Sequence, residues 1–314
     1  MSELEKIEIS YPDLEINVVR AKEPIEVPIV ESRIATAVAS PNFVRHITFD
    51  ISGTPLEGKF HAGQSIGVVA DGVDENGKPH KVRLYSVCSP SRGEDGHGKL
   101  VATTVKRVID ENWETQKLFT GVCSNFLCNQ KVGSVVKVTG PSGKRFILPE
   151  NPQDYNYLFF GTGTGVAPFR GMIMDLMELN SKNEIVMIFG SPYRTDILYG
   201  DYFKSLEKTI DNFHFLTSIS RENPRADGTK HYVQYQLLDN RDLLEPILQK
   251  PNTLIYVCGL KGMETGIYQI LAQQGLWDYI SVKDDLMQKN PLTWTYDDLK
   301  AGVKSSDRMH IEVY

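Results

Sequence analysis

Residues 157–170 read YLFFGTGTGVAPFR, and this stretch decides the fold of the C-terminal half of the chain. An apolar run of strand length leads into Gly161, Gly163 and Gly165, and the proline of APFR suits the first turn of a helix. Such a turn lets backbone amides and the helix N-terminus face a phosphate. The G-x-G-x-x-G dinucleotide fingerprint would need glycine at Val166. Taken alone, the stretch is therefore only a weak indication of a nucleotide site.

Apolar strands alternate with helical segments through the rest of the C-terminal half. After the hinge LPENPQDY come YLFFG, VAPFRGMIMDLMEL, EIVMIFG, DYFKSLEKTI, FHFLTSIS, TLIYVCG and METGIYQILAQQG. Alternation of this kind is typical of a parallel sheet covered by helices. We predict a doubly wound α/β domain over residues 151–314.

The N-terminal half has a different rhythm. Short β-branched runs broken by turns, such as HAGQSIGVVA, VRLYSVCS, KLVATTVKRV and GSVVKVTGPSG, predict an antiparallel β-barrel or sandwich over residues 32–150. One short helix is expected around SNFLCNQK. Residues 1–31 are acidic and contain three prolines, so we expect an extended arm there.

Composition narrows the class of protein. The 314 residues are 41% hydrophobic and 24% charged, as in ordinary soluble proteins, and no apolar run is long enough for a membrane span. The first twenty residues lack an apolar core or a transit-peptide pattern, which favours a cytoplasmic protein. Cys123 and Cys128 have the spacing of half an iron–sulfur motif, but the next cysteine is missing, so neither a cluster nor another metal site is predicted.

Charge is unevenly distributed along the chain. Residues 32–149 carry 15 Lys and Arg against 10 Asp and Glu, whereas residues 1–31 carry 3 against 8 and residues 150–314 carry 16 against 22. One interpretation is ordinary scatter; the other is a basic face that attracts an acidic partner. The overall charge of −6 does not suggest nucleic-acid binding.

Two stretches of the C-terminal half could bind the adenosine end of a nucleotide. Ser220 and Arg221 in SISREN follow a strand, and a guanidinium matches the oxygens of the 2′-phosphate of NADP. Lys230 and Tyr232 in KHYVQ offer a second charge and a ring for adenine. The alternative is a solvated loop with ordinary charges.

Three further stretches carry candidate residues. In RLYSVCS, Arg83 could meet a pyrophosphate, Tyr85 could stack on a planar ring and Ser86 could donate a hydrogen bond. In GVCSNFL, Ser124 could cap a short helix whose amides bind phosphate. In VCGLKGME, Cys258 stands at the C-terminal end of a strand, where doubly wound domains bind ligands. The alternatives are an ordinary alternating strand and a buried, inert cysteine.

The order of these motifs is more specific than any one of them. RLYS, GVCSNFLC, GTGTGVAPFR, SREN, CGLKGME and a terminal EVY follow one another over residues 32–314. In this order the chain resembles the plant-type, or plastidic-class, ferredoxin–NADP reductases. The ending IEVY separates it from diflavin reductases, which share the middle motifs but typically end on tryptophan.

The resemblance implies that the barrel binds FAD and that the α/β domain binds NADP(H). It places two groups of residues in cofactor binding. The FAD side comprises Arg83, Leu84, Tyr85, Ser86, Thr104, Val122, Cys123 and Ser124, with Lys106 a candidate for positioning NADP. The NADP side comprises Thr164, Ser220, Arg221, Lys230, Tyr232, Gln234, Gly259 and Leu260.

The resemblance also gives a role to the terminal residue. Tyr314 would stack on the flavin face opposite Tyr85 and would move aside when the nicotinamide arrives. Ser86, Cys258 and Glu312 would shape the site of hydride transfer. The implied reaction is hydride exchange between NADP(H) and FAD, coupled to one-electron exchange with an acidic ferredoxin or flavodoxin. Lys144, Arg145 and Arg45 are candidate docking residues, and we expect a monomer.

The motifs are also compatible with other functions. The same scaffold could serve another acceptor, such as an oxygenase or a quinone. A non-catalytic nucleotide-binding module is an alternative from another class, and it would be colourless.

Three features depart from the family pattern. Asp110 stands where a tyrosine usually stacks on the FAD adenine, and Trp113 could substitute for it. Arg194 replaces a small polar residue and could add a phosphate contact. The segment MQKNPLTWTYDDLKAGVKSSDR is longer than expected.

Overall fold

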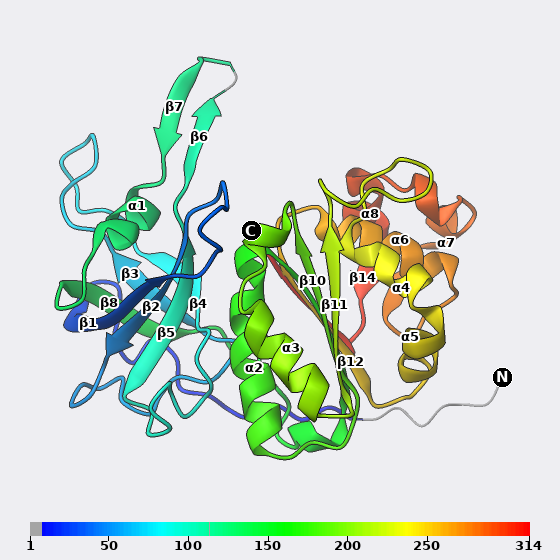
Figure 1. Cartoon of the computed structure of the whole chain (residues 1–314), viewed down its shortest axis with the longest axis horizontal. Helices are drawn as coiled ribbons and strands as arrows, with labels where there is room; N and C mark the ends of the chain where they lie inside the picture. Colours follow the sequence, from blue (N-terminus) through cyan, green and yellow to red (C-terminus); the bar gives the residue numbers. More distant parts are fainter. Residues whose placement is uncertain (1–7, 113) are drawn as a thin grey trace. The chain divides into compact units, whose positions relative to one another are not determined.

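The computed structural model describes residues 8–112 and 114–314, which form two compact units (Figure 1). The barrel unit consists of residues 13–148 and 167–175. The α/β unit consists of residues 149–166 and 176–314, together with the described residues before position 13. The predicted two-domain fold, an antiparallel barrel followed by a doubly wound parallel sheet, is confirmed.

Six antiparallel strands form the sheet of the barrel unit, in the order β4-β3-β8-β1-β2-β5. A bridge between Val87 and Thr103 joins the two ends of this order, so the sheet closes on itself. Side chains from alternate positions fill the interior, among them the fully buried Ile47, Phe49 and Val68. The strands are β1 (Ile25–Ile34), β2 (Val44–Asp50), β3 (Ser65–Val69), β4 (Arg83–Ser86), β5 (Leu100–Lys106) and β8 (Val135–Ser142).

Residues 25–31 belong to the barrel and are not part of an extended arm. They form most of β1, which pairs with β8 and then with β2. Val27 and Ile29 are completely buried, because every second residue of the stretch faces the barrel interior. The hydrophobic alternation in IEVPIVES was therefore the feature that the prediction of an acidic arm overlooked.

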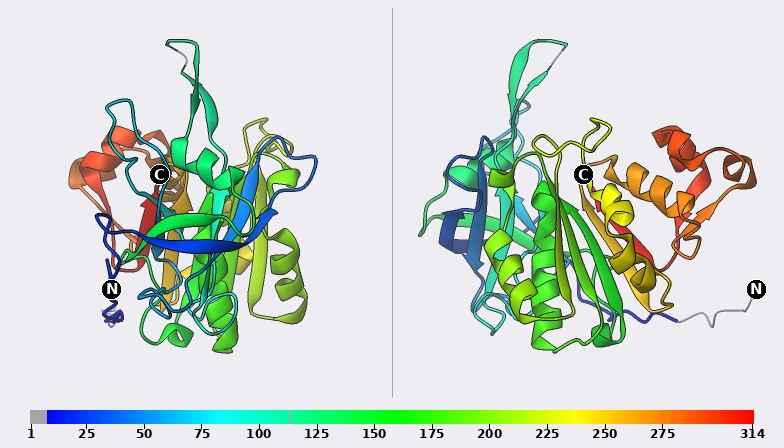
Figure 2. Two further views of the ribbon diagram at one scale, coloured as in Figure 1. Left: turned by 90° about the vertical axis from the view of Figure 1, so that its left-hand side faces the viewer. Right: turned by 45° about the vertical axis from the view of Figure 1, so that its right-hand side comes forward.

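A hairpin and a short helix complete the barrel unit. Strands β6 (Ile109–Asn112) and β7 (Lys117–Thr120) pair only with each other and project from the barrel (Figure 2). Helix α1 (Val122–Asn129) follows directly, as predicted for SNFLCNQK. Leu127 and Cys128 anchor the helix in the barrel core.

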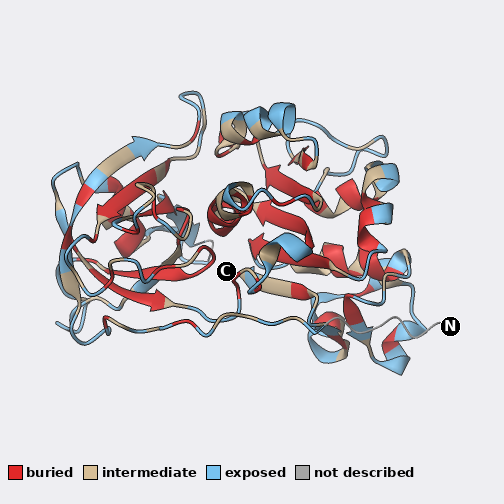
Figure 3. Cartoon of the chain, turned by 90° about the horizontal axis from the view of Figure 1, so that it is seen from below, coloured by how far each residue is buried: buried red, intermediate tan, exposed pale blue. Residues whose placement is uncertain are grey.

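The α/β unit is built on five parallel strands in the order β11-β10-β9-β12-β15. Strand order reverses between β9 and β12, which creates the crevice where doubly wound domains bind their ligands. The strands are β9 (Asn156–Thr162), β10 (Ile185–Ser191), β11 (Phe213–Ile219), β12 (Thr253–Gly259) and β15 (Met309–Val313). Figure 3 shows that the central strands are buried along their length.

Helices cover both faces of this sheet. Leu158, Ile188 and Val257 face one core, which α4 (Gln236–Asp239), α5 (Arg241–Leu248) and α6 (Met263–Gln273) cover. On the opposite face, Phe203 of α3 (Gly200–Thr209) packs on Phe213 and Phe215. Helix α2 (Ala167–Glu178) begins directly after the glycine-rich turn.

The long segment before the C-terminus is ordered as a small appendage of the α/β unit. It begins where α7 (Asp284–Met287) ends and contains α8 (Tyr296–Gly302) and β14 (Val303–Ser305), which pairs with β13 (Ile280–Val282). Thr295 begins α8 with a capping box, in which its hydroxyl and the Asp298 carboxylate satisfy each other's backbone amides. Among the described residues, no helix combines the length and the apolar character needed to cross a membrane.

Candidate functional site

Strand β4 presents the residues predicted to meet the flavin. Arg83 and Leu84 are exposed, whereas Tyr85 and Ser86 are half-buried. The Thr103 hydroxyl donates a 2.8 Å hydrogen bond to the Ser86 carbonyl oxygen, which anchors the end of the strand. Burial raises the pKa of Tyr85, so its phenol stays protonated.

The N-terminus of α1 lies next to this strand. The Tyr85 hydroxyl and the Cys123 thiol are within hydrogen-bond reach of each other. The N-cap residue is Gly121, which has no side chain, so the prediction that Ser124 caps the helix is wrong. Ser124 lies inside the first turn, where its hydroxyl donates to the Gly121 carbonyl and accepts from the Val108 amide. The amides of a first helical turn have no partner within their own helix. They are therefore available to a phosphate group.

Of the other predicted FAD-side residues, Val122 and Lys106 are exposed and Thr104 is buried in β5. Exposed apolar side chains beside an uncapped helix start suit a cofactor with a planar ring and a pyrophosphate. The residues of β4 and α1 thus fit FAD on chemical grounds.

The crevice of the α/β unit depends on close backbone contact between the glycine-rich turn and β12. A Cβ atom at Gly165 would lie 2.2 Å from the Cys258 carbonyl oxygen, and one at Gly259 would lie 2.1 Å from the Thr162 hydroxyl. Leu260, which follows, is exposed, and its amide donates to the Thr162 hydroxyl at 3.1 Å. Glycine is thus required sterically at the two places where the strands meet the turn.

The last residue of the chain is held on three sides within the α/β unit. The Tyr314 amide donates to the Gly259 carbonyl, and the Lys261 amide donates to the Tyr314 carbonyl, both at 3.0 Å. The Tyr314 hydroxyl lies 2.6 Å from the Thr164 hydroxyl. The backbone of this terminus is therefore anchored, while the residue as a whole is 58% exposed and can meet a ligand.

Cys258 and Glu312 lie side by side at the end of the sheet. They are direct partners in the pairing of β12 with β15. Burial raises the pKa of the Cys258 thiol, and the nearby Glu312 carboxylate raises it further, so the sulfur stays protonated at neutral pH. Partial desolvation also raises the pKa of Glu312, although its side chain keeps contact with solvent. The structure thus brings together a neutral thiol and a carboxyl group near the terminal tyrosine.

The predicted phosphate-binding loop follows β11. The exposed Arg221 guanidinium donates to the Tyr193 hydroxyl at 3.1 Å and lies 5.6 Å from the centre of its ring. The amide of Ser220 donates to the Ser191 carbonyl. The Tyr193 contact orients Arg221 and leaves the remaining guanidinium donors for an anion.

The remaining predicted NADP residues lie further along the same unit. Lys230 and Tyr232 are exposed. Gln234 is half-buried and packs so closely on α6 that a Cβ atom at Gly266 would lie 2.5 Å from its amide nitrogen. Gln234 is thus held by the helix, whereas Lys230 and Tyr232 are accessible.

Arg194 is engaged differently from the prediction. Its side chain forms a 3.3 Å ion pair with Glu222, and its amide donates to the same carboxylate. A second bond at 3.3 Å reaches Asn223. The Glu222 carboxylate already neutralises the positive charge of Arg194 that would attract a phosphate.

The hairpin β6–β7 contains Asp110, the residue that stands in place of the family's adenine-stacking tyrosine. Asp110 is directly opposite Phe119 in the hairpin, and both side chains are exposed. Residues directly opposite each other in an antiparallel pair point to the same face. Phe119 thus offers an exposed ring beside Asp110. Trp113, the other candidate, lies outside the described residues.

Two features of the sites were not found from the sequence. One is Tyr193 beneath Arg221, although a tyrosine directly after a parallel strand was a usable signal. The other is the bond between Thr164 and Tyr314, which no local pattern could reveal because the residues are 150 positions apart.

Fold and site together define a two-domain oxidoreductase that binds a nicotinamide nucleotide. Residues 159–269 match the family model for the oxidoreductase NAD-binding domain. The chain is 37% identical over 306 residues to the ferredoxin–NADP reductase of Picosynechococcus sp., covering 95% of this chain and 72% of the relative. It is 36% identical to the enzyme of the same name from Spirulina sp., of which it covers 99%.

A plant relative gives the same result, and a protozoan structure has the same fold. The chloroplastic leaf isozyme 1 of ferredoxin–NADP reductase from Oryza sativa subsp. indica is 38% identical, with 95% of this chain and 79% of the relative covered. The solved Plasmodium falciparum ferredoxin–NADP+ reductase with 2′P-AMP superimposes with a TM-score of 0.70, over 95% of this chain and 99% of the other, at 22% identity. The chain belongs to the ferredoxin–NADP reductase family. Enzymes of this family are oxidoreductases that use FAD and NADP(H).

Proposed function

We propose that this protein exchanges a hydride between NADP(H) and FAD and single electrons with ferredoxin. Family membership supports the reaction class. The observation that carries the proposal for this chain is the terminal tyrosine, anchored by its backbone and hydrogen-bonded to Thr164 of the glycine-rich turn. A ring in that position can respond to a nucleotide bound at the turn.

On the barrel side, we propose that Tyr85 and Leu84 cover the flavin ring system and that Arg83 binds its phosphates. Val122, Cys123 and Ser124 supply the amides of the α1 N-terminus to the pyrophosphate. FAD, when bound, supplies the chemistry that joins one two-electron transfer to two one-electron transfers.

On the α/β side, Thr164, Gly259 and Leu260 contact the middle of NADP(H). Ser220, Arg221 and Lys230 bind the 2′-phosphate, with Tyr232 and Gln234 beside the adenosine. Arg221 is the strongest of these contacts because its fork of donors matches phosphate oxygens. The positions of Thr104 and Lys106 on β5 suggest supporting roles.

We propose that Tyr314 moves aside for the nicotinamide and that Cys258 then contacts the incoming ring as a neutral thiol. The raised pKa of Cys258 suits this role, because a thiolate would repel or attack the ring. Glu312, whose pKa is also raised, can hold a proton beside the site. Ser86 donates a hydrogen bond to the flavin.

The electron partner is proposed to be an acidic ferredoxin, or a flavodoxin, that binds basic residues of the barrel unit. Arg145 is exposed, and Lys144 makes a long contact of 3.5 Å with the exposed Asp13. Arg45 is a weaker candidate, because its guanidinium bonds Ser32 at 2.9 Å.

A monomeric state and a cytoplasmic location stay predictions. All four cysteines lie within the described residues and form no disulfide there.

The visible spectrum of the purified protein, recorded before and after anaerobic addition of NADPH, tests the proposal. We expect flavin bands that bleach with NADPH and much more slowly with NADH. A colourless protein that cannot be reconstituted with FAD would contradict it. Cytochrome c reduction that depends on added ferredoxin then identifies the acceptor; reduction of flavodoxin, an oxygenase or a quinone alone would point to another enzyme on the same scaffold.

A further inference from the structure

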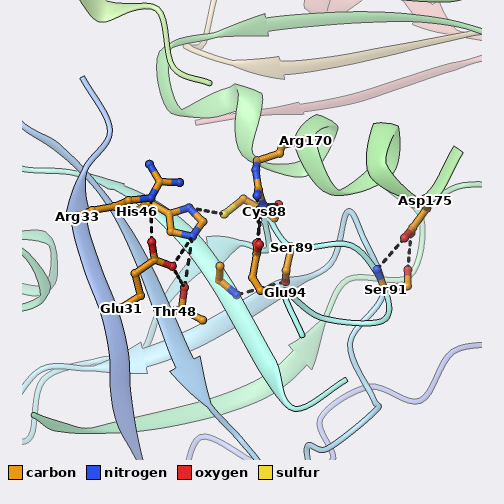
Figure 4. Close-up of polar contacts among 11 residues, drawn as sticks. Glu31, Arg33, His46, Thr48, Cys88, Ser89, Ser91, Glu94, Arg170 and Asp175 are labelled. Atoms are coloured by element: carbon orange, nitrogen blue, oxygen red, sulfur yellow. Dashed lines mark hydrogen bonds and ion pairs between the residues drawn. The ribbon is translucent and has the colours of Figure 1, made fainter. Parts of the chain in front are cut away.

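A histidine, a cysteine and a glutamate form a cluster of possible metal ligands in the barrel unit. None of the three has a role in the proposed binding of FAD or NADP(H). The cluster comprises His46 on β2, Cys88 after β4, and Glu94 in the loop before β5, all in the barrel unit (Figure 4). One ligand atom from each lies within 4.8 Å of the others. His46 and Cys88 are buried, and Glu94 is partly accessible.

We propose that His46, Cys88 and Glu94 form a binding site for a zinc-class divalent cation, with water as the fourth ligand. Imidazole, thiolate and carboxylate are the three protein ligands that zinc takes most often. This inference is independent of the proposed reaction, since it involves neither the nucleotide-binding residues nor the flavin-facing residues.

The spacing of His46 and Cys88 already suits a tetrahedral ion. The Cys88 sulfur lies 3.5 Å from His46 Nδ1. Two ligands at the usual zinc–sulfur and zinc–nitrogen lengths are about 3.5 Å apart in a tetrahedral site. The thiol and the ring nitrogen therefore need little movement to share a metal, once the proton between them is lost.

The far side of the histidine ring is arranged as in known zinc sites. His46 Nε2 faces the Glu31 carboxylate at 3.6 Å and the Thr48 hydroxyl at 3.3 Å, and that hydroxyl also donates to Glu31 at 3.0 Å. A carboxylate at one ring nitrogen holds the proton there and leaves the lone pair of the other nitrogen for the metal.

Glu94 is the ligand that must change partners. Arg170 forms a two-point ion pair with Glu94, the second contact measuring 3.1 Å, and also donates to the Cys88 carbonyl at 2.7 Å. Coordination would move the carboxylate on the order of 1 Å. Arg170 would keep the carbonyl as an acceptor. Because metal and guanidinium compete for one carboxylate, we expect weaker binding than in closed structural zinc sites.

Equilibrium dialysis of the FAD-loaded protein against buffered free Zn²⁺, with metal analysis, tests the site. We expect one saturable zinc per chain and at least a tenfold loss of affinity in Cys88→Ala. Cys128→Ala is the matched control, since Cys128 is buried in the same unit and its sulfur interacts with the Val105 carbonyl at 3.8 Å and with Arg107, neither of which belongs to the proposed site. Glu31→Gln should weaken binding about tenfold through the histidine.

Two outcomes would overturn the proposal. One is the absence of a saturable site in the unmodified protein; the other is equal affinity in the Cys88 and Cys128 variants. Glu94→Gln keeps the shape of the side chain and gives the same test if Cys88→Ala folds poorly. X-ray absorption of the zinc-loaded protein should show one sulfur in the first shell, and a shell of nitrogen and oxygen alone would exclude Cys88.

Discussion

The phenolic oxygen of Tyr314 lies 2.6 Å from the hydroxyl oxygen of Thr164, a residue 150 positions earlier in the chain. The bond joins the end of the last strand to the turn after the first strand of the parallel sheet. It places the terminal ring next to the backbone that would bind the NADP pyrophosphate. The ring of Tyr314 is thus connected to the nucleotide site before any ligand arrives.

Tyr314→Ser should relax the preference for NADP over NAD. Without the ring, the nicotinamide of either coenzyme can dock without displacing a side chain. The binding energy of the 2′-phosphate is then no longer needed for that displacement, so NADPH loses part of its advantage over NADH. We expect the ratio of kcat/KM for NADPH to that for NADH to fall at least tenfold. Tyr314→Phe, which keeps the ring and loses only the hydrogen bonds of the hydroxyl to Thr164 and to the Gly165 backbone, should keep most of the ratio. An unchanged ratio in Tyr314→Ser would show that the ring is not a barrier.

Arg221→Ala should raise the KM for NADPH roughly 10- to 100-fold and leave that for NADH almost unchanged, because a charged hydrogen bond to phosphate is lost. Arg194→Ala is the control, since that guanidinium is paired with Glu222. Steady-state kinetics with both coenzymes measures the difference. Equal losses with the two coenzymes would place the 2′-phosphate elsewhere.

Phe119→Ala should weaken retention of FAD. The exposed ring lies opposite Asp110, where the family tyrosine is missing, and loss of one aromatic stack costs about 1 kcal/mol. Dialysis or fluorescence titration of the released flavin gives the dissociation constant. Leu118→Ala, on the opposite face of the same strand, is the matched control. If both variants hold FAD alike, the adenine does not use this ring.

Gly165→Ala should destabilise the α/β unit by roughly 1–3 kcal/mol, since its Cβ would lie 2.2 Å from the Cys258 carbonyl oxygen. Gly77→Ala is a surface control, because nothing lies within 4 Å of its Cβ although its φ of +73° adds some strain. Denaturant unfolding reports both changes. A loss no larger at Gly165 than at Gly77 would mean that the turn shifts without cost.

Stability should fall on mild acidification through His310. Its Nε2 lies 2.7 Å from the Tyr11 hydroxyl, its ring stacks on Tyr256, and burial lowers its pKa from 6.5 to about 4. Below pH 6.5 the unfolded chain takes up a proton that the folded one refuses. The contribution of His310 to the free energy of unfolding is therefore fully present above pH 6.5 and is lost as the pH falls towards 4. By pH 5 the free energy of unfolding should have fallen by about 2 kcal/mol.

Chemical denaturation at several pH values measures this slope. His310→Gln should flatten it between pH 6.5 and 4, whereas replacement of the exposed His97 by glutamine should not. A slope that is the same in both variants would assign the acid sensitivity to other groups.

Local patterns determined much of the fold in advance. The alternation of apolar strands with helices predicted the parallel sheet, and the β-branched runs predicted the barrel, because side-chain periodicity and burial are set within a few residues. The short helix predicted around SNFLCNQK is present at Val122–Asn129, but it begins two residues earlier, after Gly121 and not at Ser124. Residues 25–31 were wrongly predicted as an arm because charge was weighed above alternation.

The sequence by itself also supplied candidate residues for both nucleotide sites, because each motif is a continuous stretch of the chain; their contacts with the cofactors stay predictions. Only the tertiary structure decided which side chains meet across the chain. It turned Arg194 towards Glu222, brought Tyr314 to Thr164, and collected His46, Cys88 and Glu94 in one cluster. Such pairs depend on the order and register of the strands. These are fixed by the burial of apolar side chains that are far apart in the sequence, so a short stretch of sequence cannot reveal them.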